Sequence, residues 1–282
     1  MPAGGRDLFV REWGDESGPP LLFWHALGDH TGLQVAEAAR VLTRDFGLRV
    51  IALDAPGCGE SAPATQPEDY LLSRLAALVA AVADSLRLDA PAFAGASWGG
   101  SVALAAAAAA PGRLRGLALL DSGYQAPFSG EDSLEELQRF WRAQPGFRFA
   151  SWDDWEADAR AYFGRWSPAL AALLREGMRE QDGEVVSRLG PDAYAAAIWA
   201  LRREPWSEFV APVGSSGVHV LLLAATEPPE REDERAAQLE RFTGLIPQAE
   251  IERVPGAGHP LLEEQPELVA RALGEWVARL YA

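Results

Sequence analysis

The chain has 282 residues, of which 48% are hydrophobic, and its formal net charge is −16 at pH 7. This length and apolar content fit one sizeable core with an insertion, and they exclude a disordered or collagen-like chain. The strongly negative field opposes binding to polyanions, so neither nucleic acid nor a membrane surface is an expected partner.

Signals that would direct the chain out of the cytoplasm are not found in the sequence. Residues 1–18 contain no apolar run of the kind that forms a secretory signal. The longest uninterrupted apolar runs, residues 75–83 and 102–110, are too short to span a bilayer. Cys58 is the only cysteine, so no intramolecular disulfide can form. We therefore expect a cytoplasmic protein.

Short apolar runs alternate with helix-like stretches along most of the chain. The runs predict strands buried on both faces, at residues 20–24, 48–53, 91–95, 117–120, 218–223 and 249–254. Helices are predicted over residues 31–46, 68–86, 98–110 and 263–280. The segment before residue 20 is expected to add one or two edge strands. This alternation predicts an α/β fold with a mostly parallel central sheet flanked by helices.

The alternation is interrupted between residues 124 and 212. No strand-like run is recognised there, and four helices are predicted from start signals at Ser133, Ser151, Ser167 with Pro168, and Pro191. The segment also holds 15 of the chain's 26 aromatic residues. We predict a core of residues 1–123 and 213–282 and a helical cap of residues 124–212. The cap aromatics would build its own core or line an apolar pocket.

A candidate nucleophile lies between a predicted strand and an alanine-rich helix. Residues 95–99, Gly-Ala-Ser-Trp-Gly, form a Gly-x-Ser-x-Gly motif centred on Ser97. A serine held on such a sharp strand-to-helix turn exposes its hydroxyl above the sheet. Gly95 and Gly99 would allow the chain to fold back where side chains would clash. The alternative is a glycine-rich turn in which Ser97 only caps the helix.

A serine nucleophile needs a base, and the chain contains four histidines. His219 lies within a predicted strand, which favours a structural role, and His25 and His30 flank a turn after the strand at residues 20–24. His259 follows the last predicted strand and precedes the last helix. Loops at the carboxyl ends of parallel strands surround the sites of α/β proteins. His259 is therefore the predicted base.

Several motifs, in this order, give the chain a resemblance to capped members of the α/β-hydrolase superfamily. Residues 24–28, Trp-His-Ala-Leu-Gly, resemble the His-Gly segment after the third strand, although Ala26 stands where glycine is usual. Residues 54–61, Asp-Ala-Pro-Gly-Cys-Gly-Glu-Ser, resemble the Asp-x-Pro-Gly-x-Gly-x-Ser loop of the family. The serine motif and His259 then follow. The resemblance implies an oxyanion hole formed by the backbone N–H groups of Leu27 and Trp98.

The resemblance leaves two carboxylates open as the acid that orients His259. Counting past the strand that follows the insertion leads to Glu227, which we favour, since glutamate serves as the acid in some family members. The chain order Ser97, Glu227, His259 is also the order of the family. The alternative is Asp121, which ends the strand at residues 117–120 and occupies a position that other members use.

The implied chemistry is acyl transfer, in which Ser97 attacks a carbonyl, His259 takes its proton and water releases the acid. No metal or other cofactor is expected, because the histidines lack zinc-binding spacing. The expected substrates are small, neutral, apolar or aromatic carboxylic esters. Lactone hydrolysis and cleavage of a carbon–carbon bond in a diketone are alternatives with the same residues. The alternative of another class is a non-enzymatic small-molecule receptor on the same fold.

Overall fold

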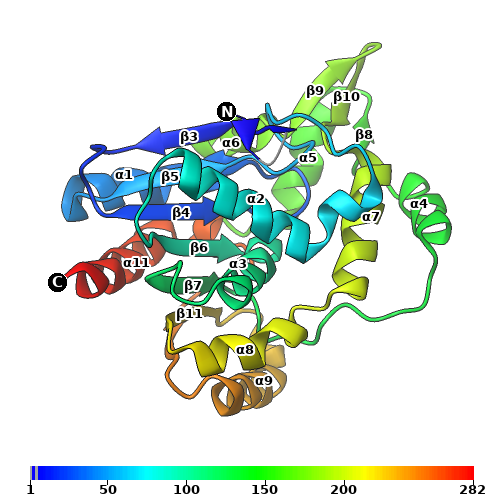
Figure 1. Ribbon diagram of the computed structural model, residues 1–282. Helices are drawn as coiled ribbons and strands as arrows, with labels where there is room; N and C mark the ends of the chain where they lie inside the picture. The colour runs from blue at the N-terminus through cyan, green and yellow to red at the C-terminus, as the bar shows by residue number, and fades with distance from the viewer. Residues whose placement is uncertain (1, 4–5) are drawn as a thin grey trace.

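The computed structural model describes residues 2–3 and 6–282, and its centre is a seven-stranded sheet (Figure 1). The strand order is β12-β11-β7-β6-β4-β5-β3, and only β3 runs antiparallel, against β5. These strands are β3 (Val10–Trp13), β4 (Pro20–Trp24), β5 (Arg49–Leu53), β6 (Ala92–Ala96), β7 (Gly116–Leu120), β11 (His219–Ala225) and β12 (Glu250–Val254). A two-stranded ribbon, β1 (Pro2–Ala3) with β2 (Arg6–Asp7), precedes them. The predicted mostly parallel sheet is confirmed.

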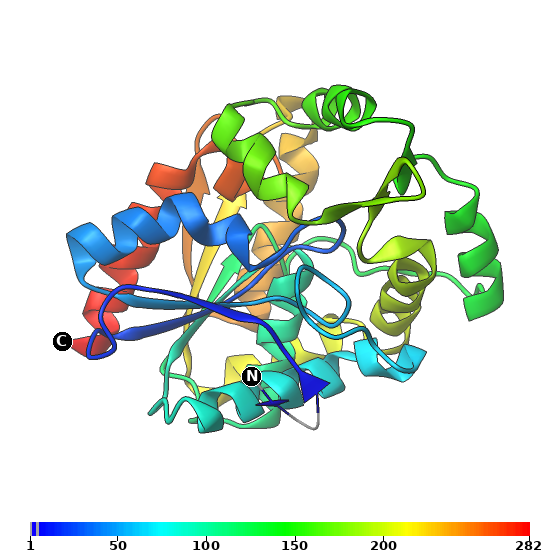
Figure 2. The same ribbon diagram turned by 90° about the horizontal axis from the view of Figure 1, so that it is seen from above.

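Helices cover both faces of this sheet (Figures 1 and 2). Their bounds are η1 (Gly32–Val35), α1 (Ala36–Phe46), η2 (Pro67–Tyr70), α2 (Leu72–Ser85), α3 (Trp98–Ala109), η3 (Pro229–Arg231), α9 (Glu232–Leu245), α10 (Leu261–Glu264) and α11 (Pro266–Tyr281). Helices α1 and α11 pack together on one face, and α2 and α3 pack together on the other. Helix α1 ends at Phe46, as the predicted range 31–46 does, and Gly47 after it adopts a left-handed conformation with φ of 64°. Helix α9, whose first turn of residues 232–235 is entirely charged, is not among the predicted helices.

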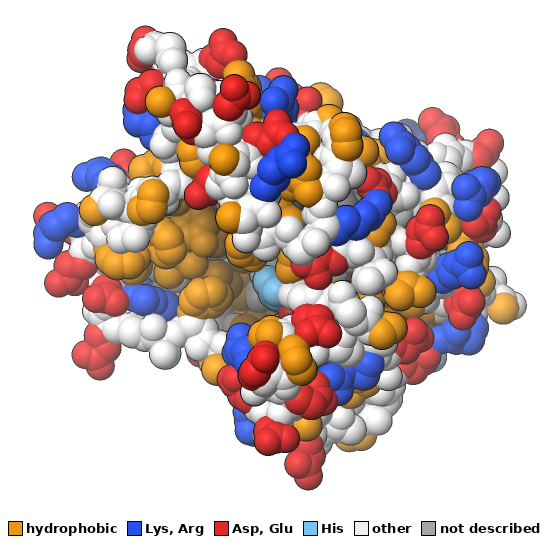
Figure 3. Space-filling model, turned by 180° about the vertical axis from the view of Figure 1, so that it is seen from behind, with side chains coloured by type: hydrophobic (Ala, Val, Ile, Leu, Met, Phe, Trp, Pro, Cys, Tyr) orange, Lys and Arg blue, Asp and Glu red, His pale blue; other side chains and the backbone are white. Residues whose placement is uncertain are grey.

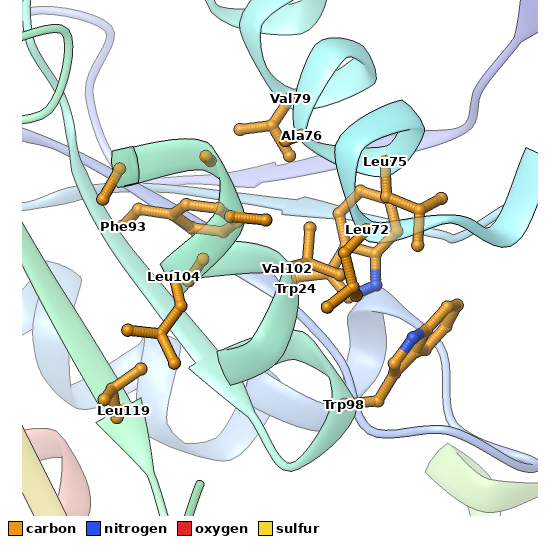
Figure 4. Packing of buried hydrophobic residues seen from close by; sticks show 14 of the residues in the cluster. Trp24, Leu72, Leu75, Ala76, Val79, Phe93, Trp98, Val102, Leu104 and Leu119 are labelled. Carbon is orange, nitrogen blue, oxygen red and sulfur yellow. The ribbon is translucent and has the colours of Figure 1, made fainter. Parts of the chain in front are cut away.

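The core between the sheet and helices α2 and α3 contains several of the largest buried side chains (Figure 4). Trp24 of β4 and Phe93 of β6 are fully buried there, against Leu75 of α2 and Val102 of α3. Burying a side chain of this size contributes about 1.5–3 kcal/mol relative to leaving it exposed. The layer fixes the end of β6 against the start of α3, which is where the candidate nucleophile lies.

The insertion contains a small antiparallel sheet, so the prediction that it is free of strands is wrong. Its elements are α4 (Leu134–Arg142), β8 (Arg148–Phe149), α5 (Trp152–Tyr162), α6 (Pro168–Arg175), β9 (Met178–Gln181), β10 (Glu184–Ser187) and α7 (Gly190–Arg203). The strand order is β8-β10-β9. Asp182 and Gly183 connect β9 to β10 with φ of 54° and 82°. An Asp-Gly pair is a sequence signal for a hairpin. The hairpin was not predicted because the strands on either side of this pair are short and partly polar.

The predicted boundary between residues 212 and 213 falls inside a helix, α8 (Ser207–Ser216). Helix α8 packs against α3 of the core, so the chain has already returned to the core before residue 213. Figure 1 shows the elements from α4 to α7 gathered at the end of the sheet toward which its parallel strands point. The insertion therefore lies over the carboxyl ends of the strands. None of the helices in the described part of the chain has the length and apolar character needed to cross a bilayer.

Candidate active site

Ser97 lies on a strained turn between β6 and α3. Its φ and ψ are 51° and −113°, a conformation that costs a non-glycine residue of the order of 1–3 kcal/mol. A Cβ atom on Gly95 would lie 2.1 Å from the carbonyl oxygen of Gly99. A Cβ on Gly99 would lie 2.1 Å from the carbonyl oxygen of Trp24. Both glycines are thus required by close backbone approach, and the turn presents Ser97 into a cavity.

His259 reaches Ser97 from the loop between β12 and α10. Its Nε2 lies 2.8 Å from Ser97 Oγ, a hydrogen-bond distance. The loop is held by the Gly258 N–H, which donates to Glu264 Oε2 at 2.6 Å. The His259 side chain is 46% exposed, and it lines the same cavity as Ser97. The structure therefore brings together the two residues predicted as nucleophile and base.

The carboxylate beside His259 is Asp121, and the prediction that Glu227 orients this histidine is wrong. His259 Nδ1 lies 2.7 Å from Asp121 Oδ2, so with Nε2 on Ser97 both ring nitrogens are engaged. Asp121 directly follows β7, the strand next to β6, and its φ of 45° turns the chain there. Glu227 lies beyond the end of β11, one strand further away, and is exposed.

The Asp121 carboxylate is buried and surrounded by hydrogen-bond donors. Its Oδ1 accepts the Ala225 N–H at 2.9 Å and the Tyr124 hydroxyl at 2.5 Å, and Gln125 Nε2 lies 3.2 Å from Oδ2. Burial, with the charge of Asp121, raises the pKa of the Tyr124 phenol above its usual value, so it remains a donor. Donors of this kind fix the orientation of the carboxylate. Tyr124 and Gln125 are site residues that the sequence analysis missed.

The two residues predicted as oxyanion donors, Leu27 and Trp98, line the same cavity as Ser97. Trp98 is the first residue of α3, and the first N–H groups of a helix have no acceptor within it. Leu27 lies in the loop after β4. The role of their N–H groups in holding an oxyanion remains a prediction.

His25 is a structural residue. It is fully buried, its Nδ1 donates to the Ala26 carbonyl at 2.6 Å, and its Nε2 accepts the Ala55 N–H at 3.0 Å. The ring thus joins the loop after β4 to the loop after β5. Burial lowers the pKa of His25 to about 3, so the imidazole is neutral in the folded protein near pH 7.

We expect the free energy of unfolding to fall as the pH is lowered from 6.5 toward 3. The unfolded chain binds a proton at His25 in this range and the folded chain does not, which costs at most about 1.4 kcal/mol per pH unit. Urea unfolding between pH 7.5 and 4.5 measures this slope. His25→Asn should flatten it, whereas replacing the exposed His219 by asparagine should not. An unchanged slope in His25→Asn would contradict the assignment.

The cavity above Ser97 has a volume of about 760 Å³. From the insertion and the segments next to it, the cavity is lined by Phe128, Tyr162, Tyr194, Leu201 and Trp206. Figure 3 shows an open hollow with hydrophobic walls and a histidine at its edge. In the described part of the chain, His, Cys, Asp and Glu form no group of three that could hold a metal ion. The site thus offers a chamber beside a nucleophile with a base, and its wall is apolar on the side of the insertion and charged where Arg231, Glu234 and Arg235 line it.

Comparison with protein families matches residues 21–272 to the model described as the alpha/beta hydrolase family. Among curated proteins, the dihydrolipoyllysine-residue acetyltransferase component of the acetoin cleaving system of Pseudomonas putida is 42% identical over 42% of this chain and 31% of its own length. A proline iminopeptidase of Neisseria meningitidis is 30% identical over 40% of this chain and 35% of its own length. The matched region thus spans about a third of each of these relatives.

A solved structure of E-2-(acetamidomethylene)succinate hydrolase is similar over nearly the whole chain. It superimposes with a TM-score of 0.78 at 24% identity, covering 99% of this chain and 97% of that one. At this identity the likeness concerns the fold alone. The names of these three similar proteins give three different activities, so they do not indicate one substrate for this chain.

Proposed function

This chain belongs to the α/β-hydrolase family, and we propose that within it the protein is a serine hydrolase of carboxylic esters or related acyl compounds. The observation that carries the proposal is the chain of hydrogen bonds from Ser97 through His259 to Asp121, at 2.8 and 2.7 Å. Acyl transfer requires a nucleophile that is hydrogen-bonded to a base, and a base that is hydrogen-bonded to an orienting acid. The strained conformation of Ser97 gives independent support, since strain of this kind gathers at functional sites.

In the proposed mechanism, His259 Nε2 takes the proton of Ser97 Oγ as that oxygen attacks the carbonyl carbon. The negative charge that develops on the carbonyl oxygen is held by the N–H groups of Leu27 and Trp98, each contributing about 3–4 kcal/mol. The imidazolium of His259, steadied by Asp121, then gives its proton to the leaving group. Water attacks the acyl-enzyme with His259 as base, which releases the acid and restores Ser97.

We propose neutral substrates with an apolar or aromatic group. The cavity wall formed by Leu201, Trp206 and Tyr194 would bury apolar surface of a bound substrate. Phe128 and Tyr162 extend this lining to the exposed rim of the cavity. The net charge of −16 further disfavours substrates that carry a free carboxylate or phosphate. Both features support medium-sized esters of neutral acids over acetates and dicarboxylate half-esters.

The substrate proposal predicts that extending a p-nitrophenyl acetate to a butanoate raises kcat/KM about tenfold, because each buried methylene contributes about 0.8 kcal/mol. A succinate half-ester should have a lower kcat/KM than the butanoate, because its free carboxylate is repelled. Raising the salt concentration should reduce this difference between half-ester and butanoate but not the difference between acetate and butanoate. Trp206→Ala should weaken the chain-length preference. Trp152→Ala is the matched control, since Trp152 packs in the separate aromatic cluster of the insertion.

The same panel should include a lactone, a thioester, an aminoacyl amide and a ring-cleavage diketone. If the diketone has the highest kcat/KM of all the substrates, the activity of the protein is carbon–carbon bond hydrolysis and the proposed ester hydrolysis is wrong. At most one acid released per protein molecule would indicate a receptor. Acetate or half-ester substrates performing best at both salt concentrations would contradict the apolar-chamber interpretation.

A further inference from the structure

The loop after β4 is connected by side chains to the helix that follows His259. The Ala26 N–H donates to Gln34 Oε1 at 2.8 Å, and Gln34 Nε2 donates to Glu263 Oε1 at 2.8 Å. Glu263 lies on α10, four residues after His259. The Ala26 amide and the side chains of Gln34 and Glu263 thus form one hydrogen-bonded link between two loops of the site. The ends of this link are 237 positions apart in the sequence.

The Glu263 end of this link is buried and is balanced by a neighbouring charge. Glu263 is only 6% exposed, and its Oε1 lies 3.0 Å from His30 Nε2, as in an ion pair. Burial alone would lower the pKa of His30, but Glu263, together with Asp29, raises it above its usual value. A buried carboxylate needs such compensation, because leaving it unpaired is costly. The ion pair therefore holds Glu263 where Gln34 can reach it.

His25 holds the Ala26 carbonyl and Ser187 holds the Asp29 side chain, but between these two contacts the loop contains an unpacked residue. Gly28 has a φ of 106°, and a Cβ atom placed on it would meet no heavy atom within 4 Å. Leu27 lies between this unpacked glycine and Ala26, whose N–H is the group that Gln34 holds. An oxyanion donor acts only within about 2.7–3.1 Å of the developing charge, so small shifts of the Leu27 amide matter.

We propose that Gln34 and Glu263 are positioning residues, which fix the oxyanion loop relative to the His259 loop through the Ala26 amide. This inference rests on the proposed function, because it assigns the Leu27 N–H to the transition state of acyl transfer. His30 supports the pair by balancing the charge of Glu263. None of the three side chains takes part in bond making or breaking.

The test is an exchange of the two side chains. Gln34→Glu keeps an acceptor for the Ala26 N–H but places two carboxylates together, and Glu263→Gln removes the charge that faces His30. Each single variant should lower kcat about tenfold or more with KM changed less than twofold, because the oxyanion contact is made mainly in the transition state. The double variant restores a donor facing an acceptor and should recover most of kcat, a non-additivity that a general loss of stability does not produce.

Tyr281→Phe is the matched control for lost hydrogen bonds. The Tyr281 hydroxyl donates to the carbonyls of Pro20 and Ala90 at the opposite ends of the strands, at 3.3 and 3.2 Å. This variant should lower the unfolding free energy and leave kcat unchanged. An equal fall of kcat in Tyr281→Phe, or a double variant no better than the singles, would overturn the proposal.

Hydrogen exchange of the amides of residues 25–30 separates this inference from the proposed function. Exchange there should accelerate about tenfold in Gln34→Ala and remain unchanged in Tyr281→Phe, whatever the substrate. If the wild type hydrolyses no ester but exchange accelerates, ester hydrolysis is wrong and the link still positions the loop. Unchanged exchange in Gln34→Ala would overturn the link.

Discussion

Ser97→Ala is expected to abolish hydrolysis, with a loss of the order of 10⁶ in kcat if the triad behaves as in subtilisin. The Ser97 hydroxyl is the group that would form the acyl-enzyme, and His259 has no other nucleophile at 2.8 Å to activate. Alanine is smaller, so it adds no clash to the turn between β6 and α3. The thermal midpoint of unfolding should therefore stay within a few degrees of the wild type.

The measurement is kcat for the best ester of the panel, with covalent labelling by a fluorophosphonate as an independent readout. Ser101 provides a matched control, because it lies one turn later on α3 and lines the same cavity. Ser101→Ala should keep most of the activity and should still be labelled. Substantial turnover by Ser97→Ala, with normal unfolding, would remove Ser97 from the mechanism.

Asp121→Asn is expected to lower kcat by about 10⁴, as the corresponding substitution does in trypsin. The substitution keeps the size of the side chain, but an amide has an N–H₂ group that can face His259 Nδ1. The imidazole then carries its proton on Nε2, which faces Ser97 and can no longer accept the hydroxyl proton. The loss should appear in kcat, because the geometry of the substrate chamber is unchanged.

Glu227→Gln is the matched control for Asp121→Asn. Glu227 is exposed, so neutralising it should change kcat less than twofold. Measuring both variants with the same ester at the same pH compares the two carboxylates directly. The reverse ranking, a large loss in Glu227→Gln and a small one in Asp121→Asn, would show that the loop after β11 rearranges during catalysis.

The amino-acid sequence by itself determined the main sheet, its crossover helices except α9, and the local turns that carry Ser97 and His259. Buried parallel strands read as continuous apolar runs, which is why the run at residues 20–24 coincides with β4. Ser97 and His259 could be found because each stands in a local pattern, a glycine-bracketed turn and a loop after the last strand. Each of these patterns depends only on neighbouring residues, so each could be recognised without knowledge of the tertiary structure.

Only the tertiary structure decided which carboxylate accompanies His259. Asp121 and Glu227 both follow strands of the same sheet, so the sequence places both near its carboxyl edge. Which carboxylate contacts His259 depends on the order of neighbouring strands and on the backbone turn at Asp121. Neither of these can be predicted from the residue types alone. The link from Ala26 through Gln34 to Glu263 was invisible for the same reason, since its partners are distant in the chain and meet only when the sheet has formed.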